Sequence, residues 1–265
     1  MIVDTGEVKL FVQQSGEGEP LILIHGLGMS SALWINQIPV FSQRFHTVAV
    51  DLRGFGQSSH PDGPGDYAID ILAEDIAVLI ERLDLGRCHI LGTSMGGFIG
   101  QALALAHPNL CRSLLLCHTA PRMSIPSDVL ERRVEALRNL PLEEYAELVV
   151  EQACSANASR ELRTWVAGLL VRNDKCIYTQ VMTEGLRDFD VGADLGGINI
   201  PTLVITGEHD LVLPKEGGEE IARLIPGARL VEITGVGHLG YAERPAVFNE
   251  AVLSFLNDVQ KRGQI

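Results

Sequence analysis

The 265-residue chain is poor in cysteine, and the cysteines it has form no recognisable motif. There are five, an odd number, and no two are spaced as C-x-x-C. Neither a disulfide framework nor a cysteine-rich metal site is expected from this pattern. Cys88 and Cys117 lie in apolar runs and are expected to be small buried hydrophobic residues, and a catalytic cysteine is not expected either. We therefore predict a reducing, cytoplasmic location and no bound metal.

Long hydrophobic runs and an excess of basic charge are also lacking. No apolar stretch approaches the roughly 20 residues of a membrane span. The first residues, MIVDTGEVKLFV, lack the basic and apolar regions of a signal peptide. Lys and Arg number 21 against 34 Asp and Glu, a net charge of −13. This balance disfavours nucleic acid and anionic membrane surfaces as partners and leaves a small-molecule substrate. It does not indicate an oligomeric state.

What is present is an alternation of short apolar runs with helical patterns. This alternation predicts an α/β fold, a mostly parallel sheet flanked by helices. Residues 7–13 alternate as an edge strand does, and residues 30–45 follow a helical pattern. The buried strands are predicted at residues 21–24, 47–51, 88–92, 111–118, 201–207 and 228–234.

One region interrupts the alternation. From residue 120 to residue 196 the chain shows helical patterns and no strand. We predict a core domain of residues 1–119 and 197–265, with residues 120–196 forming a helical cap over it. Ligands of open parallel sheets bind at the carboxyl ends of the strands. A cap that leaves from the end of strand 111–118 is placed to cover such a site.

The segment CHILGTSMGGFIG places one serine between a predicted strand and a predicted helix. Gly92-Thr93-Ser94-Met95-Gly96 fits the G-x-S-x-G pattern of a nucleophile elbow. In that motif a sharp turn exposes the serine hydroxyl, and the following backbone N–H is free to bind an oxyanion. Ser94 is thus the candidate nucleophile, and the Met95 N–H a candidate oxyanion-hole donor. The segment is neither G-x-G-x-x-G nor a Walker loop, so we expect no nucleotide cofactor.

A serine nucleophile needs a general base and an acid that orients it. His238 lies after the last strand in the glycine-containing loop GVGHLGYAERP and is the preferred base; His118 and His209, also at strand ends, remain possible. Asp210, after strand 201–207, is the preferred acid, with Glu208 as a competitor.

The loop after the first buried strand reads His25-Gly26-Leu27-Gly28. A second oxyanion-hole donor is expected from an early strand loop of this kind, and we assign it to the Leu27 N–H. Gly26 and the Leu27 side chain are expected to line the substrate pocket. His25 is expected to stabilise the loop by hydrogen bonding.

Taken together, these segments resemble the α/β-hydrolase fold family over essentially the full chain. The matching segments are HGLG, DLRGFGQS, GTSMGG, GEHDLVLP and GHLGYAERP. The resemblance implies an α/β-hydrolase fold with a cap inserted after the sixth strand. It also implies a catalytic triad of Ser94, Asp210 and His238 in the chain order of that family.

Three longer segments carry a narrower likeness: SALWINQIPVFSQRFHTVAVDLRGFGQSS, SMGGFIGQALALAHP and LLLCHTAPRM. In these segments the chain looks most like the 3-oxoadipate enol-lactonase and carboxylesterase group. The resemblance implies hydrolysis of an ester or lactone through an acyl-enzyme. One departure is His118, which stands where enol-lactonases often have Asn. Carbon–carbon bond hydrolases of ring-cleavage products and slow-turnover small-molecule sensors share the triad and remain alternatives.

Substrate choice is expected to depend on the cap. Arg122, just beyond strand 111–118, is a candidate for binding a substrate carboxylate, although a surface ion pair is the favoured interpretation. Trp165, Met123 and Leu213 are further candidates for the pocket lining.

Overall fold

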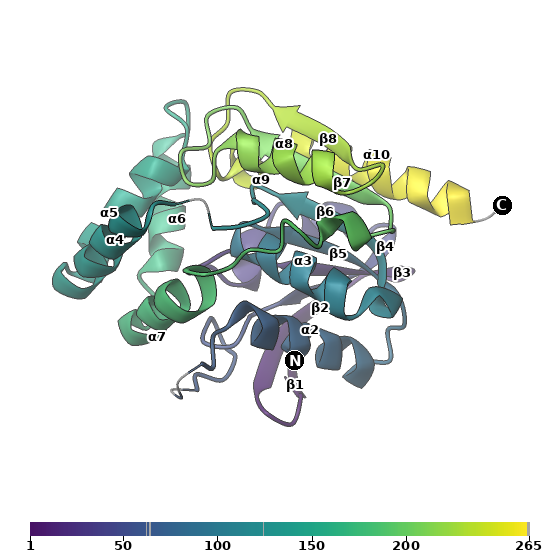
Figure 1. Ribbon diagram of the computed structural model, residues 1–265, viewed down its shortest axis with the longest axis horizontal. Helices are drawn as coiled ribbons and strands as arrows, with labels where there is room; N and C mark the ends of the chain where they lie inside the picture. Colours follow the sequence, from purple (N-terminus) through teal and green to yellow (C-terminus); the bar gives the residue numbers. More distant parts are fainter. Residues whose placement is uncertain (62, 64, 124, 264–265) are drawn as a thin grey trace.

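The computed structural model describes residues 1–61, 63, 65–123 and 125–263. An eight-stranded sheet runs through the centre of the fold, in the order β1-β2-β4-β3-β5-β6-β7-β8 (Figure 1). Strands β1 and β2 are antiparallel to their neighbours, and all the remaining pairs are parallel. The strands are β1 Ile2–Asp4, β2 Lys9–Ser15, β3 Glu19–Ile24, β4 Phe45–Val50, β5 Cys88–Thr93, β6 Cys111–Cys117, β7 Thr202–Gly207 and β8 Arg229–Ile233.

The sheet is buried on both faces because its strands carry apolar side chains on both sides. In β3, Ile22 and Ile24 belong to one hydrophobic cluster, whereas Leu21 and Leu23 belong to the other. Such continuous apolar runs are typical of parallel strands covered on both faces. Helices α2 (Ile69–Arg82), α3 (Met95–Ala106) and α8 (Lys215–Leu224) contribute to the first cluster, and α1 (Ile38–Phe41) and α10 (Pro245–Gly263) to the second.

The order of the strands creates a crevice beside β3. From β3 the chain crosses to β4 on one side and later returns to β5 on the other. The loops that follow β3 and β5 therefore diverge, and ligands of such sheets bind at this switch point. Ile24 at the end of β3 pairs with Gly92 in β5. The register thus places the His25–Gly28 loop directly beside Ser94.

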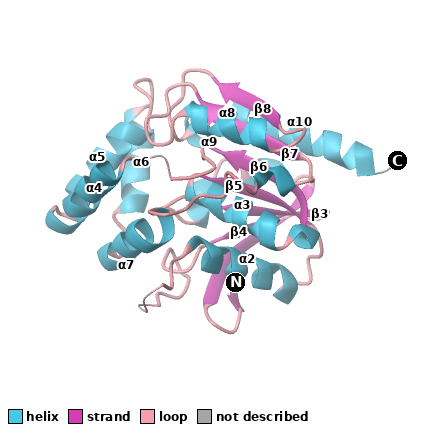
Figure 2. Cartoon of the chain, in the orientation of Figure 1, coloured by secondary structure: helices cyan, strands magenta, loops and turns pink. Residues whose placement is uncertain are grey.

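Four α-helices lie between β6 and β7, on the left in Figures 1 and 2. They are α4 (Ser127–Asn139), α5 (Leu142–Ala153), α6 (Arg160–Leu170) and α7 (Lys175–Gln180), and a π-helical turn, η3 (Val181–Leu186), continues α7. Residues 127–186 are called the helical insertion below. No strand occurs among the described residues between 120 and 196, although Arg122 and Asp190 form one isolated bridge.

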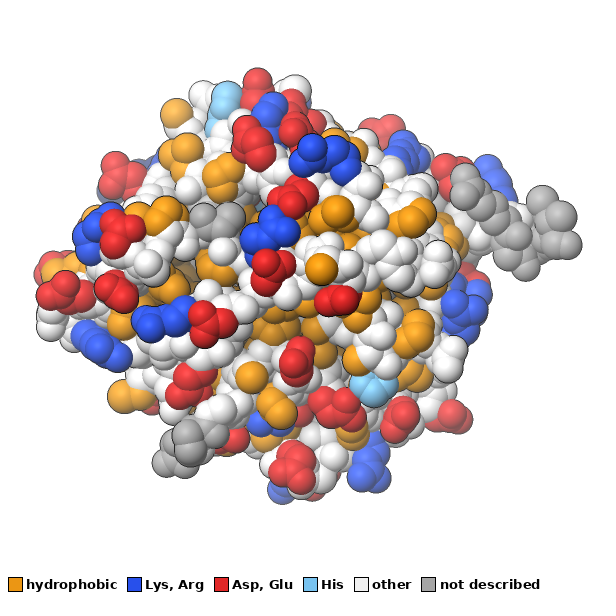
Figure 3. Space-filling model, in the orientation of Figure 1, with side chains coloured by type: hydrophobic (Ala, Val, Ile, Leu, Met, Phe, Trp, Pro, Cys, Tyr) orange, Lys and Arg blue, Asp and Glu red, His pale blue; other side chains and the backbone are white. Residues whose placement is uncertain are grey.

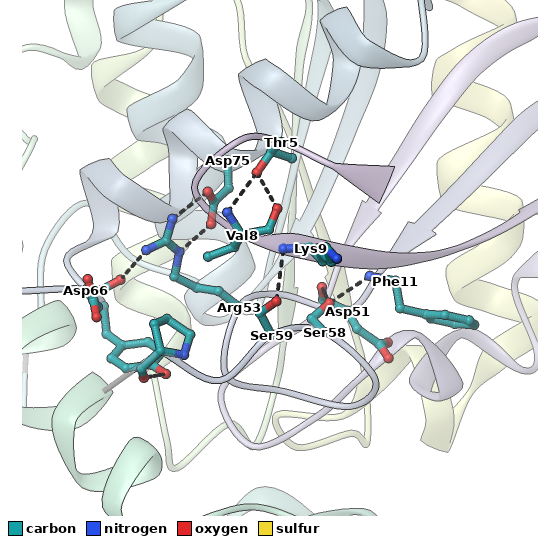
Figure 4. Close-up of polar contacts among 12 residues, drawn as sticks. Thr5, Val8, Lys9, Phe11, Asp51, Arg53, Ser58, Ser59, Asp66 and Asp75 are labelled. Atoms are coloured by element: carbon teal, nitrogen blue, oxygen red, sulfur yellow. Dashed lines mark hydrogen bonds and ion pairs between the residues drawn. The ribbon is translucent and has the colours of Figure 1, made fainter. Parts of the chain in front are cut away.

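A buried ion pair joins the loop after β4 to helix α2. The Arg53 guanidinium binds the Asp75 carboxylate with two nitrogens, at 2.5 and 2.7 Å, and donates a third hydrogen bond to the Asp66 carbonyl (Figure 4). Both side chains of the ion pair are about 5% exposed. Burial of this kind is tolerated only when each charge keeps its partner.

The same loop is also bonded to the N-terminal hairpin. The Ser58 hydroxyl accepts the Phe11 N–H at 2.8 Å and donates to the Asp51 carbonyl. The Ser59 hydroxyl accepts the Lys9 N–H at 3.0 Å (Figure 4). These bonds attach residues 51–59 to strand β2, so the loop has a fixed path near the carboxyl end of β4.

Two local elements differ from what the sequence analysis predicted. Strand β1 was not predicted, because three residues are too few to show alternation. The predicted helix at 30–45 is instead a 3-10 turn, η1 (Ser31–Trp34), followed by the short α1, with Pro39 in its first turn. Proline has no N–H to continue a preceding helix, so it favours a new start over one long helix.

Acidic and basic side chains are interspersed on the face shown in Figure 3 and form no patch of one sign there. Within the part of the chain that the structure describes, no helix is long and apolar enough to cross a membrane.

Candidate active site

Ser94 lies in a strained turn between β5 and α3. Its φ and ψ are +55° and −121°, which non-glycine residues rarely adopt. The turn is held by backbone hydrogen bonds: the Ser94 N–H donates to the Cys117 carbonyl at 2.9 Å, and the Gly97 N–H donates to the Ser94 carbonyl at 2.8 Å. Such strain costs of order 1–3 kcal/mol and persists only where surrounding structure enforces it.

Two glycines allow this turn to form. A Cβ at Gly92 would lie 2.0 Å from the Gly96 carbonyl oxygen, and one at Gly96 would lie 2.3 Å from the Ile24 carbonyl oxygen. Neither position has room for a side chain. The glycines of the motif therefore let strand β3, the turn and helix α3 approach one another closely.

Two backbone amides beside Ser94 are free to bind a ligand. Among the described residues, neither the Leu27 nor the Met95 N–H donates to another group. Met95 is the first residue of α3, where the helix dipole places partial positive charge. The Leu27 loop is adjacent, because a Cβ at Gly26 would lie 3.1 Å from the Ser94 Cβ.

His25 fixes the conformation of the Leu27 loop. Its Nε2 accepts the Leu52 N–H at 3.0 Å, so the proton lies on Nδ1, which donates to the Gly26 carbonyl at 2.7 Å. Burial lowers the pKa of His25, so the ring remains neutral and keeps this tautomer. The expectation that His25 stabilises the loop agrees with these contacts.

Asp210 and His238 form a buried pair at the ends of β7 and β8. The Asp210 Oδ2 accepts a hydrogen bond from the His238 Nδ1 at 2.7 Å. Its other oxygen, Oδ1, accepts the Val212 and Leu213 N–H groups, each at 2.9 Å. Burial would raise the pKa of Asp210, but the nearby imidazoles outweigh it and hold this pKa well below its usual range. The carboxylate is therefore ionised and can orient the imidazole.

The competing acid, Glu208, is directed elsewhere. Its carboxylate accepts the Gly235 N–H at 2.8 Å and lies 3.7 Å from the His209 ring nitrogen. Both side chains are exposed. The structure therefore does not bring Glu208 or His209 into the Asp210–His238 pair.

A cavity of about 340 Å³ opens above Ser94, between the sheet and the helical insertion. Ser94 and His238 both line it. Most of the remaining lining is apolar and includes Tyr145 and Tyr178 from the helical insertion, whose rings meet edge to face. Four predicted site residues are part of the lining: Leu27, Met95, Met123 and Leu213. Gly26, also expected there, is not part of the lining, although it lies against Ser94.

Two arginines on α4 also line this cavity, and they differ in their partners. Arg132 forms an ion pair with Asp128 at 2.7 Å. Arg133 donates to the neutral Gln152 side chain at 2.8 Å and has no carboxylate partner among the described residues. A second cavity, of about 470 Å³, shares Arg133 with the first. An unpaired cation thus lies where the two cavities meet.

The sequence comparison agrees with this architecture. The family model described as "alpha/beta hydrolase fold" matches residues 19–245. The chain belongs to the α/β-hydrolase fold family. Among curated proteins it is 29% identical to 3-oxoadipate enol-lactonase 2 of Acinetobacter baylyi, over 88% of this chain and 86% of that protein.

Further relatives of this α/β-hydrolase include an esterase and a lactonase of known structure. It is 26% identical to the pimeloyl-acyl-carrier-protein methyl ester esterase of Aeromonas hydrophila, over 94% of this chain and 100% of that protein. The crystal structure of the enol-lactonase from Burkholderia xenovorans superimposes with a TM-score of 0.91 at 30% identity, covering 97% of this chain and 100% of that one.

Two predicted substrate-binding residues of this α/β-hydrolase lie away from the main cavity. Arg122 is bound to two carboxylates, Glu220 at 2.7 Å and Asp190 at 3.1 Å, and lines the second cavity instead. Trp165 lines a separate surface groove beside α1 and α6. An arginine with two carboxylate partners has little charge left for a ligand, so the ion-pair interpretation of Arg122 is the better one.

Sequence reasoning missed Arg133. In the pattern ERRVEALRN of α4, a charged residue looks like part of a solvated helix face, and only the packed helix shows that it borders a cavity. No group of three or more His, Cys, Asp or Glu side chains among the described residues is arranged to hold a metal ion.

Proposed function

We propose that the chain is a serine hydrolase that cleaves a carboxylic ester or lactone through an acyl-enzyme intermediate. One observation carries the proposal. Ser94, on a strained turn, and His238, oriented by the ionised Asp210, line the same cavity. A nucleophile, a base and an orienting acid in one chain, with a cavity for the substrate, are the parts that acyl transfer needs.

In the proposed acylation step, the His238 Nε2 takes the proton of the Ser94 hydroxyl as the Ser94 Oγ attacks the carbonyl carbon. Asp210 keeps the Nδ1 proton in place and stabilises the imidazolium that forms. The Leu27 and Met95 N–H groups donate to the oxyanion of the tetrahedral intermediate. Removal of one such donor typically costs about 3–4 kcal/mol of transition-state stabilisation.

When the intermediate collapses, the carbon–oxygen bond to the leaving group breaks and the imidazolium returns its proton to the leaving oxygen. In a lactone that oxygen remains tethered to the acyl group. Water, deprotonated by His238, then attacks the acyl carbon, and the Ser94 Oγ leaves and takes back that proton from the imidazolium. An ester thus yields an acid and an alcohol, and a lactone yields a single ring-opened acid.

The cavity further supports a substrate whose acyl part carries a carboxylate. Arg133 is a cation that borders a mostly apolar cavity and has no carboxylate partner among the described residues. A guanidinium donates two parallel hydrogen bonds to a carboxylate, and this contact strengthens where water is excluded. The 3-oxoadipate named for one relative is itself a dicarboxylate.

Replacement of the nucleophile tests the proposal. We expect Ser94→Ala to lower kcat for p-nitrophenyl acetate by at least about 10⁴-fold, because loss of a serine nucleophile removes the covalent route. Circular dichroism and thermal unfolding should show a folded protein, since alanine keeps the backbone and removes one oxygen. Near-wild-type turnover by a folded Ser94→Ala protein would contradict the proposal.

The time course of the wild-type protein separates an enzyme from a slow-turnover sensor. A hydrolase gives sustained release of p-nitrophenol, whereas a sensor stops after one equivalent per chain. A panel of an enol-lactone, short esters and a ring-cleavage dienone, with products identified by mass spectrometry, then distinguishes ester or lactone cleavage from carbon–carbon bond hydrolysis.

A further inference from the structure

A second histidine, His118, lies against the acid of the proposed triad. It follows β6 directly, with a φ of +48°, and its side chain is fully buried. It is not among the residues that line the cavity above Ser94. Its position is thus next to the catalytic machinery but outside the substrate space.

The His118 ring shares an oxygen of Asp210 with His238. The His118 Nδ1 lies 3.6 Å from the Asp210 Oδ2, the same oxygen that accepts the His238 Nδ1 at 2.7 Å. A movement of about half an ångström would bring the longer contact into hydrogen-bond range. Neither nitrogen of His118 has another hydrogen-bond partner among the described residues.

The surroundings determine which nitrogen of His118 carries the proton. The Nε2 is packed against Gly240, where a Cβ would lie 2.7 Å away, and meets no acceptor there. The Nδ1 faces a carboxylate, which favours an N–H on that side. Burial lowers the pKa of His118 despite the nearby charges of Asp210 and Glu243, so the ring is neutral at neutral pH.

The groups that face His118 come from three elements. Asp210 follows β7, His238 follows β8, and Tyr241 and Glu243 belong to α9 (Gly240–Glu243). Glu243 is already bonded to the Gly237 N–H at 2.9 Å. Of the two carboxylates, Asp210 is therefore the one in direct contact with the imidazole.

We propose that His118 is a positioning residue that directs a second N–H at the Asp210 Oδ2. This contact restrains the Asp210 carboxylate beside His238. It also draws negative charge away from the hydrogen bond between Asp210 and His238. Its effect on turnover rests on the proposed serine-hydrolase function, whereas its protonation state does not. The two can therefore be tested separately.

The protonation state is tested by NMR of protein labelled with ¹⁵N-histidine. We expect the His118 resonances to show a neutral ring protonated on Nδ1 at pH 7 and pH 8, and the His118→Asn variant to identify them by their loss. His25 provides an internal reference, because its contacts give the same tautomer. An Nε2–H tautomer, or an imidazolium at pH 7, would overturn the proposal without involving activity.

The effect on turnover is tested with variants that differ in the N–H. His118→Asn keeps a donor near the Nδ1 position and tolerates a positive φ, whereas His118→Gly keeps the backbone but removes the donor. We expect the glycine variant to lower kcat about tenfold with KM unchanged. The acidic limb of its kcat/KM profile should move to higher pH by about half a unit, because Asp210 then interacts with His238 alone.

His118→Asn should retain most of kcat, and the acidic limb of its kcat/KM profile should stay at the wild-type pH. His89→Asn, which alters another buried histidine far from Asp210, controls for loss of a core imidazole. Equal losses in both His118 variants, or an unmoved limb in the glycine variant, would overturn the proposal. Wild-type turnover in Ser94→Ala would instead contradict the proposed function and leave the NMR result to decide the role of His118.

Discussion

At the scale of single residues, the candidate site combines backbone strain at Ser94 with hydrogen bonds to both oxygens of Asp210. Ser94 is held in an unfavourable conformation by backbone bonds. Asp210 has each oxygen bonded to groups of the chain, two amides on one side and His238 on the other. In the proposed mechanism, such contacts would fix the orientation of the reacting groups before a substrate arrives and so reduce the reorganisation that the reaction requires.

Replacement of Arg133 tests whether the cavity favours a substrate that carries a carboxylate. We expect Arg133→Gln to raise KM about tenfold or more for the p-nitrophenyl half-ester of a dicarboxylic acid, because the substrate carboxylate loses a charge-assisted hydrogen bond. KM for an uncharged acyl ester of equal length should change less than about twofold, since the glutamine retains the bulk of the wall.

Arg132→Gln is the matched control for this measurement, because Arg132 lines the same cavity on the same helix but is paired with Asp128. We expect it to leave both KM values near wild type. Equal effects of the two substitutions on the charged substrate, or an equal effect of Arg133→Gln on both substrates, would contradict a specific carboxylate site.

The contrast between Arg122 and Arg133 shows what sequence patterns can predict. Both are arginines near apolar residues in one segment. From the sequence, only Arg122 was named as a candidate for a substrate carboxylate, because it follows a strand, and a surface ion pair was the favoured interpretation even for it. The structure pairs Arg122 with Glu220, 98 residues later in the chain. Such long-range partners leave no local signal, whereas the Ser94 turn was predictable because its glycines and its strand–helix context are local.

At the scale of elements, the sheet sets the spacing of the site. The loops that carry Leu27 and Ser94 leave paired positions of β3 and β5. These strands and their helices were predictable from apolar runs. Strand β1 was not, because its three residues depend on pairing with β2 rather than on their own pattern.

The buried ion pair between Arg53, in the loop after β4, and Asp75, in α2, should contribute to the free energy of unfolding. Asp75→Asn should lower the free energy of unfolding by about 3–5 kcal/mol, because it leaves the buried Arg53 charge without its partner. Urea unfolding at pH 7.5 measures this change. Asp128→Asn, which removes an exposed ion pair, is the control and should change stability by less than about 0.5 kcal/mol.

The double variant Arg53→Met with Asp75→Leu should recover much of the loss, because it removes both charges together. A stability of Asp75→Asn within 1 kcal/mol of wild type would show that the Arg53 charge finds another partner or reaches water.

At the scale of the whole molecule, three buried histidines make stability depend on pH. Burial lowers the pKa of His25, His89 and His118. The unfolded chain therefore binds more protons than the folded one below about pH 6.5, and stability falls as the pH falls through that value. Each ring contributes at most about 1.4 kcal/mol per pH unit.

We expect the free energy of unfolding to be lower at pH 5.5 than at pH 7.5, by up to about 4 kcal/mol. Urea titrations at the two pH values measure the difference. In His89→Asn the difference should shrink by about 1 kcal/mol, because one titrating group is gone. A stability that is flat or rises on acidification would show that the histidines are protonated in the folded state.

The site residues and the cavity wall belong to different segments of the chain, and this affects how substrate specificity can evolve. The proposed nucleophile and base and the two free amides belong to loops at the ends of the strands or to the start of α3, whereas Arg133 belongs to α4 in the helical insertion between β6 and β7. If the proposed function holds, we expect substitutions in α4 to change which substrate is accepted while the proposed triad stays unchanged. We therefore expect evolution toward new substrates to change the sequence of α4 and α5 before it changes the turn at Ser94.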